Sequence, residues 1–188
     1  MTDTLVFIVK FVLQAASLVF LLRFLLQAVR ADAYNPITEA IVKLSWPVLR
    51  YLRYVLPTWR NLDFAAFGMA WGINALLLVI IASHRDLPFS ALVVIGDTLR
   101  ATVSLAIGVF LVAIFATIVM SWIAPGTRSP ATSLIHDVAE PLLAPARKLI
   151  PPIGGTLDLS PMLTVLVLLV IQGPVLSAVL PYQIWHHV

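Results

Sequence analysis

The sequence contains no cysteine, and only 11% of its 188 residues are charged. The missing cysteine excludes disulfides, zinc–thiolate sites and thiol catalysis. Soluble domains usually carry about 25% charged residues, so a chain this poor in charge could not cover a water-facing surface. Hydrophobic residues make up 61% of the sequence, which is typical of a chain that lies largely in lipid.

Residue patterns that carry chemistry are also scarce. The four histidines form no His-Glu-x-x-His motif. Gly154-Gly155 form a glycine pair, but the Gly-Lys-Ser/Thr of a phosphate-binding loop does not follow them. We therefore predict no catalytic residue, no metal site and no cofactor, and we expect a protein that is not an enzyme.

Four long apolar runs predict an all-α membrane protein with about four transmembrane helices, because each span needs roughly 20 apolar residues. The runs cover approximately residues 4–29, 62–82, 98–123 and 160–181. The first run is longer than the apolar core of a signal peptide and ends at Arg30, so we expect it to be retained as a span. Gly173-Pro174 is expected to bend the fourth span.

An internal repeat organises the chain. A shift of 94 positions aligns residues 35–57 with residues 129–151 and makes seven of the 23 aligned pairs identical. Chance would give roughly two identities for this composition. The pattern predicts two parallel repeats, each a span, an amphipathic connector and a second span. The predicted limits are 1–83 for the first repeat, 84–97 for an outward-facing interfacial linker and 98–188 for the second repeat.

The two connectors, at about residues 36–57 and 130–152, are predicted to be amphipathic helices that lie on the membrane surface. Their polar residues recur at steps of three or four, and apolar residues fill the opposite face. Pro47 and Pro141 fall mid-connector, so each connector is expected to be two short helices or one kinked helix. A plain solvated loop is the alternative.

Basic residues concentrate in the connectors and predict the topology. The connector side holds Arg30, Lys43, Arg50, Arg53, Arg60, Arg128, Arg147 and Lys148, whereas the other side holds Arg85 and Arg100. By the positive-inside rule, both connectors are predicted to be cytoplasmic and both termini periplasmic. Because these cations stand in short loops between apolar runs, attraction to anionic lipid headgroups is expected rather than direct binding to nucleic acid.

Arg23, Asn74 and Gln172 are the candidate polar residues inside the membrane. The amides are expected to hydrogen-bond between helices, and Arg23 is expected to snorkel to the headgroups, with an anion or lipid headgroup ligand as the alternative. A midplane cavity lined by all three would favour transport, and a dry bundle would favour a scaffold. Asp97 and Arg100 are interpreted as an interfacial ion pair rather than a proton relay.

One charge pattern is shared by both repeats. Arg53 and Arg147 end the connectors, and Asp63 and Asp158 begin the spans that follow. An aspartate at a helix N-terminus accepts backbone N–H groups, and a guanidinium folded back over it can form a charge-assisted bond. The spacing predicts two structural ion pairs that hold each connector on its span. The alternative is that each arginine meets lipid phosphate.

Residues 140–161 closely resemble the signature of the YggT family, also called YlmG: a proline, an aliphatic pair, a basic pair, Ile-Pro, Gly-Gly and then Asp-Leu-Ser-Pro before a hydrophobic helix. The matching residues are Pro141, Arg147, Pro151, Gly154, Gly155, Asp158, Ser160 and Pro161. Residues 46–57 resemble a degenerate copy, in which residues 58–61 replace the glycine turn and Phe64-Ala65-Ala66 follows Asp63.

The resemblance implies the double-repeat form of Gram-negative bacteria, an integral protein of the cell inner membrane. Relatives are linked to cell division, nucleoid or thylakoid organisation, cytochrome assembly in chloroplasts, and osmotic or potassium homeostasis. We therefore expect a non-enzymatic structural or assembly factor of the cell envelope, with a component of small-solute or ion transport as the alternative. The expected partners are the lipid bilayer and unidentified membrane or division proteins, and an oligomer is compatible with the sequence.

Overall fold

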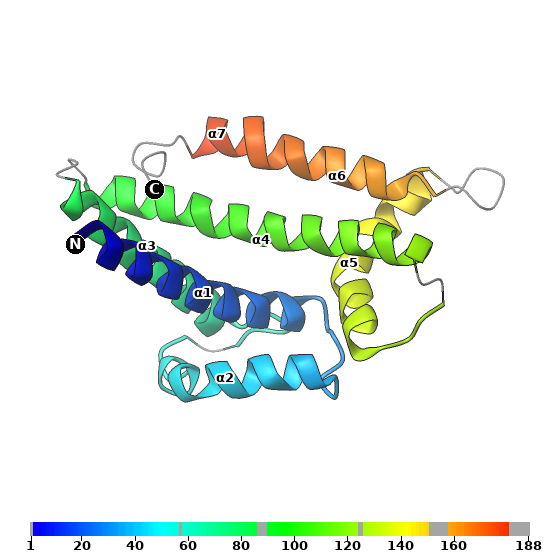
Figure 1. The fold of residues 1–188 in the computed structure, drawn as a ribbon, viewed down its shortest axis with the longest axis horizontal. Coiled ribbons are helices and arrows are strands. Elements are labelled where there is room, and N and C mark those ends of the chain that lie inside the picture. The colour runs from blue at the N-terminus through cyan, green and yellow to red at the C-terminus, as the bar shows by residue number, and fades with distance from the viewer. Residues whose placement is uncertain (1, 57, 86–89, 124–125, 151–157, 181–188) are drawn as a thin grey trace.

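The computed structural model describes residues 2–56, 58–85, 90–123, 126–150 and 158–180, and these residues form helices and no strand. In chain order the helices are α1 (Thr2–Ala28), α2 (Pro36–Leu52), α3 (Phe64–His84), α4 (Ala91–Ile123), α5 (Pro130–Leu149), α6 (Ser160–Val170), the π-helix η1 (Ile171–Val175) and α7 (Leu176–Val179). The order of long helix, connector helix and long helix thus occurs twice. Figure 1 shows α2 alongside the α1–α3 pair and α5 beneath the end of α4.

Four helical stretches are long and apolar enough to cross a membrane, so the chain is an all-α, multi-pass membrane protein, as the sequence predicts. They are Thr4–Ala28, Phe64–His84, Ala91–Ile123 and Ser160–Val179. The 33 residues of α4 make a helix of about 50 Å, which exceeds the roughly 30 Å of the hydrocarbon core. This helix must therefore tilt or project beyond the core.

The start of α4 differs from the sequence prediction. Residues 91–97, part of the predicted linker 84–97, form the first turns of α4. Val93 and Val94 pack there against buried Leu78 and Ala82 of α3. This apolar contact extends the helix beyond the predicted start of the span at about residue 98, and the linker is correspondingly shorter.

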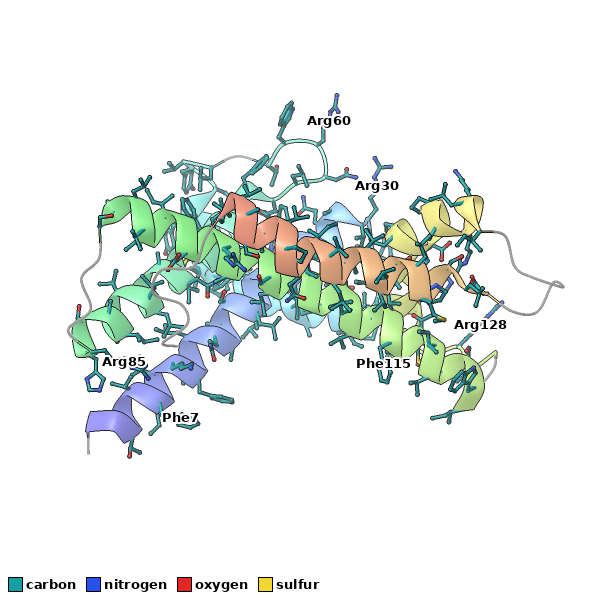
Figure 2. The ribbon with its side chains drawn as sticks, turned by 90° about the horizontal axis from the view of Figure 1, so that it is seen from above. Phe7, Arg30, Arg60, Arg85, Phe115 and Arg128 are labelled. Carbon is teal, nitrogen blue, oxygen red and sulfur yellow. The ribbon has the colours of Figure 1, made fainter. Side chains whose placement is uncertain are left out.

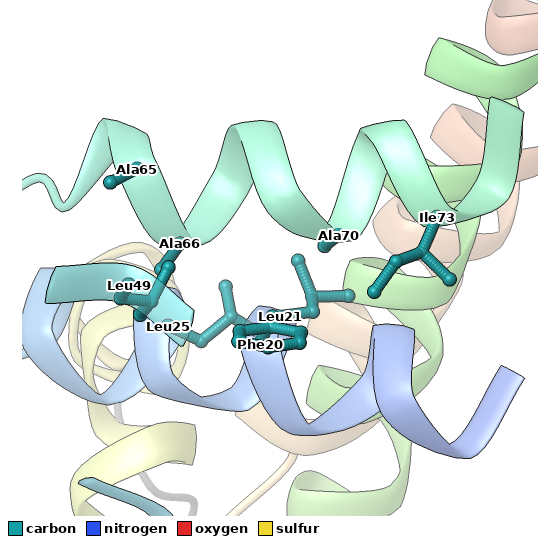
Figure 3. Packing of buried hydrophobic residues seen from close by; sticks show 8 residues of the cluster. All are labelled: Phe20, Leu21, Leu25, Leu49, Ala65, Ala66, Ala70 and Ile73. Atoms are coloured by element: carbon teal, nitrogen blue, oxygen red, sulfur yellow. The ribbon is translucent and has the colours of Figure 1, made fainter. Parts of the chain in front are cut away.

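The α1–α3 pair has a close-packed interface built on small residues. Phe20, Leu21 and Leu25 of α1 face Ala65, Ala66, Ala70 and Ile73 of α3, with Leu49 of α2 at one end (Figure 3). The alanines allow the two backbones to approach, which is typical of helix interfaces in membranes. The hydroxyl of Ser17 donates to the carbonyl oxygen of Ala70 at 3.2 Å across the same interface.

Hydrogen bonds between α3 and α4 join the first half of the chain to the second. The amide of Asn74 on α3 donates to the Thr102 hydroxyl on α4 at 2.9 Å. One turn away, the indole N–H of Trp71 donates to the Thr98 hydroxyl at 2.8 Å. Hydrogen bonds of this kind link helices where water is absent, so α3 and α4 are fixed to each other by polar as well as apolar contacts.

Each connector is one continuous helix, so the expectation of two short helices is wrong. Pro47 lies inside α2, and Pro141 and Pro145 lie inside α5. Both helices begin with an N-cap, Asn35 or Ser129, followed by a proline at the first helical position. An internal proline removes one helical hydrogen bond, and here the packing of each connector on its neighbours outweighs that loss.

The α-helical pattern of the fourth span is interrupted where the sequence predicts a bend. Ile171–Val175, which contains Gly173-Pro174, is a π-helix between α6 and α7. A proline cannot donate the regular backbone bond, and a π-turn is one way in which a helix accommodates that loss.

Candidate functional site

Arg23 lies on α1 but does not face lipid. It is only 5% exposed and points into the junction of α1, α2 and the start of α3. The expectation that it snorkels is therefore wrong for this structure, because the arginine has polar partners within the protein. Its Nε donates to Asp63 Oδ2 at 3.3 Å, and its Nη1 donates to the carbonyl oxygen of Val42 at 3.0 Å and to Ser45 Oγ at 2.8 Å.

Asp63 stands at the centre of this network and is fully buried. Its Oδ1 accepts the backbone N–H of Ala66 at 3.2 Å, which makes it the N-cap of α3. Its Oδ2 accepts hydrogen bonds from both Arg23 and Arg53. The ring of Trp46 lies 5.9 Å from the Arg23 guanidinium carbon and 5.3 Å from that of Arg53. One carboxylate thus joins α1, the end of α2 and the start of α3.

The second repeat has a related network with a different charge balance. Arg147 Nε donates to Asp158 Oδ2 at 3.0 Å, and its Nη1 donates to the two Glu140 carboxylate oxygens at 2.8 and 2.7 Å. Asp158 Oδ1 accepts the backbone N–H of Ser160 at 2.9 Å at the start of α6. Here one cation serves two carboxylates, whereas in the first repeat two cations share one carboxylate. These side chains are about one-third exposed.

The hydrogen bonds in this second network shift both ionisation equilibria. Burial alone would lower the pKa of Arg147, but its hydrogen bonds to Asp158 and Glu140 outweigh burial and raise the pKa above its ordinary value. Burial acts to raise the pKa of Asp158, yet hydrogen bonds from Ser160 and Arg147 hold it below its ordinary range. Both groups therefore stay charged at neutral pH, and the ion pair persists.

The structure brings together both predicted pairs, Arg53 with Asp63 and Arg147 with Asp158. Sequence reasoning missed two further members of the networks, Arg23 and Glu140. Glu140 could have been found, because it precedes Arg147 by two helical turns and so lies on the same face of α5. No local pattern marks Arg23 as a partner of Asp63, which lies 40 positions away.

The residues of the family motif are described in part. Pro141 and Arg147 lie in α5, and Ser160 and Pro161 begin α6. Ser160 is fully buried and its backbone carbonyl accepts the hydroxyl of Thr164 at 2.8 Å. The remaining motif residues, Pro151, Gly154 and Gly155, fall outside the described residues, as do Pro57 and residues 86–89 of the predicted linker.

Among the described residues, two separate spaces border Asn74 and Arg23. Asn74 borders a space of about 660 Å³ whose other polar lining residues are Gln14 and Ser104. Arg23 borders a separate space of about 240 Å³ at the connector end of α1. Gln172 lies half-buried in η1 and lines neither space.

The predicted interfacial pair, Asp97 and Arg100, is deeply buried in α4, at 2% and 4% exposure. The Arg100 Nη1 donates to the carbonyl oxygen of Leu180 at 2.5 Å, so this arginine links α4 to the end of α7. No set of three histidine, aspartate or glutamate side chains placed to hold a metal ion occurs within the part of the chain that the structure describes.

Comparison with known proteins shows which family the chain resembles. A family model described as CCB3/YggT matches residues 2–83 and 96–179, two segments that are consistent with a double repeat. The uncharacterized protein PA0392 of Pseudomonas aeruginosa is 35% identical over 151 residues, which cover 79% of this chain and 76% of that protein. The uncharacterized protein YggT of Escherichia coli K12 is 32% identical over 170 residues, or 90% and 88% of the two chains.

A protein of Vibrio alginolyticus, named only by its position in the proC 3' region, is 38% identical over 137 residues, which cover 71% of this chain and 72% of that one. No solved structure matches the chain.

Proposed function

The chain belongs to the CCB3/YggT family, and from that premise we propose that it is a non-enzymatic structural or assembly factor of the cell envelope. Its two connectors form one rigid cytoplasmic face that binds anionic lipid and membrane or division proteins. The observation that carries the proposal is the way each connector is joined to its span by an arginine–aspartate network.

The polar contacts that attach the connectors to the spans support this role. Loss of one partner from a buried ion pair typically costs about 3–5 kcal/mol, so Arg23 and Asp63 depend on each other to stay in place. The N-cap Asn35 of α2 also donates from Nδ2 to the carbonyl oxygen of Pro130 at 2.6 Å, which ties the first turns of α2 and α5 together. A surface fixed in this way needs little ordering when a partner binds.

The exposed side chains around α2 support a binding role. Tyr54, Trp59 and Tyr51 are exposed by 88%, 67% and 62%, and they stand among basic Arg50 and Arg60. Aromatic and basic side chains together are typical of the membrane–water interface and of protein-binding surfaces. Figure 2 shows Arg30 and Arg60 projecting from the same side of the molecule.

The geometry gives the transport alternative less support. Arg23, Asn74 and Gln172 would have to line one midplane pathway, but Arg23 is engaged by Asp63 and Asn74 donates to Thr102. The space beside Asn74 is bordered mainly by apolar side chains, whereas conduction usually requires a polar lining or a ring of charge.

Site-specific photo-crosslinking in native membranes tests the proposal. A photoreactive residue in place of exposed Tyr54 should give a reproducible adduct with a membrane protein that mass spectrometry identifies. The matched position Val112, 69% exposed on the middle of α4, should give lipid adducts only. The proposal fails if Tyr54 gives no protein adduct while the purified chain in vesicles conducts a small solute or ion and Asn74→Leu reduces that flux.

A further inference from the structure

A small cavity lies between the last turns of α1 and the first turns of α2, with a volume of about 240 Å³. Its polar lining residues are Arg23, Gln27, Arg30 and Thr38, and no carboxylate is among the residues that border it. At about 30 Å³ per water molecule in the liquid, the space is equivalent to on the order of eight waters. That is room for a small charged group together with its immediate ester atoms.

The buried hydroxyl of Thr38 is the second feature of this cavity. Thr38 is 6% exposed, and its Oγ1 is buried without a hydrogen-bond partner among the described residues. The corresponding residue of the second repeat, Thr132, accepts from the backbone N–H of Ser129 at 2.8 Å and donates to the Ser129 carbonyl oxygen at 2.9 Å. An unsatisfied buried hydroxyl is costly, so a group that accepts its hydrogen bond would be stabilised in this cavity.

The charge around the cavity favours an anion. Asp63 is shared between Arg23 and Arg53, which leaves this buried network with one more positive than negative side chain. Arg30, at the end of α1, is a further basic residue that borders the cavity, with its side chain exposed at the cavity's rim. Buried charge requires a counter-charge, and the further partners of Arg23, Val42 and Ser45, offer only neutral oxygens.

We propose that this cavity binds a phosphate group through Arg23, Arg30 and the hydroxyl of Thr38. Guanidinium groups match phosphate oxygens with paired hydrogen bonds, and a threonine hydroxyl supplies one more donor. The phosphate belongs to an anionic lipid headgroup or is free inorganic phosphate, since both present the same oxygens. The site does not depend on the proposed assembly role, because it concerns only the junction of α1 and α2.

Thermal unfolding of the full chain tests the site. The purified protein is stripped of lipid, kept in a phosphate-free non-ionic detergent, and followed by circular dichroism during titration with three probes. These are short-chain phosphatidylglycerol, inorganic phosphate and a diacylglycerol of equal chain length. A ligand that binds the folded state raises the unfolding midpoint in a saturable way. A rise with phosphatidylglycerol alone identifies the lipid as the source, and a rise with both phosphate probes identifies the phosphate group itself as sufficient.

Variants locate the binding. Thr38→Val removes a hydroxyl without a hydrogen-bond partner in the described part of the chain, so the protein should fold as before and bind the effective probe about tenfold or more weakly. Thr164→Val is the matched control: Thr164 is also 6% exposed but donates to Ser160, and its loss should leave the affinity unchanged. Arg30→Gln, at an exposed position, should weaken binding severalfold. The proposal is overturned if neither phosphate probe acts saturably, if diacylglycerol acts equally, or if Thr38→Val binds like the native chain.

Discussion

In each repeat, one aspartate near the start of the second span holds the connector helix that precedes it. Asp63 caps α3 and accepts from two arginines, whereas Asp158 accepts the Ser160 backbone N–H at the start of α6 and receives one arginine that also binds Glu140. An aspartate in this position suits both the free N–H groups and the positive end of the helix dipole. The same residue thereby begins a span and fixes the helix that precedes it.

A double-mutant cycle on Arg147→Ala and Asp158→Ala measures the coupling at the residue scale. Because both side chains are about one-third exposed, we expect a coupling free energy of about 1 kcal/mol, read from unfolding in detergent. The control cycle pairs Asp158→Ala with Lys148→Ala, because Lys148 is exposed and adjacent to Arg147 in sequence. The two free-energy changes of the control cycle should be additive within error. If the free-energy changes of Arg147→Ala and Asp158→Ala are strictly additive, the pair does not hold α5 against α6.

Residue-level prediction from sequence succeeded where the partners are close along the chain. Arg53 and Asp63 are ten positions apart, and both repeats contain the same pattern, so the contact could be anticipated. Arg23 could not be assigned in the same way. An arginine near the end of a span can reach the headgroups or turn inward, and the choice depends on whether a distant carboxylate lies beside it in the folded chain.

α2 presents three distinct faces. Thr38, Ser45 and Leu49 are buried against the protein. An exposed apolar stripe at positions i, i+7, i+11 and i+14 consists of Ile37, Leu44, Val48 and Tyr51. The charged face carries Lys43 and Arg50, and Lys43 pairs with Glu39 at 2.5 Å. A helix with separate apolar and charged exposed faces is suited to the plane of the headgroups.

Spin labels on α2 test this orientation at the element scale. Lys43→Cys and Leu44→Cys place labels on adjacent residues that are both exposed in the protein, at 74% for the lysine side chain and 68% for Leu44. In a bilayer, the label at position 43 should be accessible to a water-soluble relaxation agent and the label at position 44 to oxygen in lipid. Equal water accessibility at the two positions would rule out an interfacial α2.

The second connector differs from the first, which sequence patterning did not foresee. The buried residues of α5 are Val138, Ala139, Leu143 and Ala146, and its apolar side packs on α4 and α6. Leu149 is the large apolar side chain that stands well exposed along the described helix, at 77%. Amphipathic spacing predicts an apolar face, but it does not determine whether lipid or protein covers that face.

The sequence did not determine the exact lengths of the helices either. Hydropathy located the four spans because they are long and nearly free of charge. It could not place the start of α4 at Ala91, since the contact of Val93 and Val94 with α3 determines that boundary. The continuity of α2 through Pro47 also depends on tertiary packing, which outweighs the local preference of proline.

For the whole molecule, the proposed binding surface is one face formed by both connectors, where the ion-pair networks and most of the basic residues lie. Arg85 and Arg128 lie toward opposite ends of the molecule in Figure 2, and α1 begins at the same end where α7 finishes in Figure 1. A cytoplasmic face of two connectors requires that both lie on the same side of the membrane, opposite the connection between α3 and α4. That requirement is the central claim on which the proposed assembly role depends.

Cysteine accessibility measures this topology most directly, because the native chain has no cysteine and each substitution reports alone. Tyr54→Cys and Thr127→Cys probe the connector side, and Ser90→Cys probes the turn before α4; all three native side chains are exposed. In intact cells, a membrane-impermeant maleimide should label Ser90→Cys, and it should reach the other two only after the inner membrane is opened. Labelling of Tyr54→Cys or Thr127→Cys in intact cells, or a difference between these two, would contradict the common cytoplasmic face.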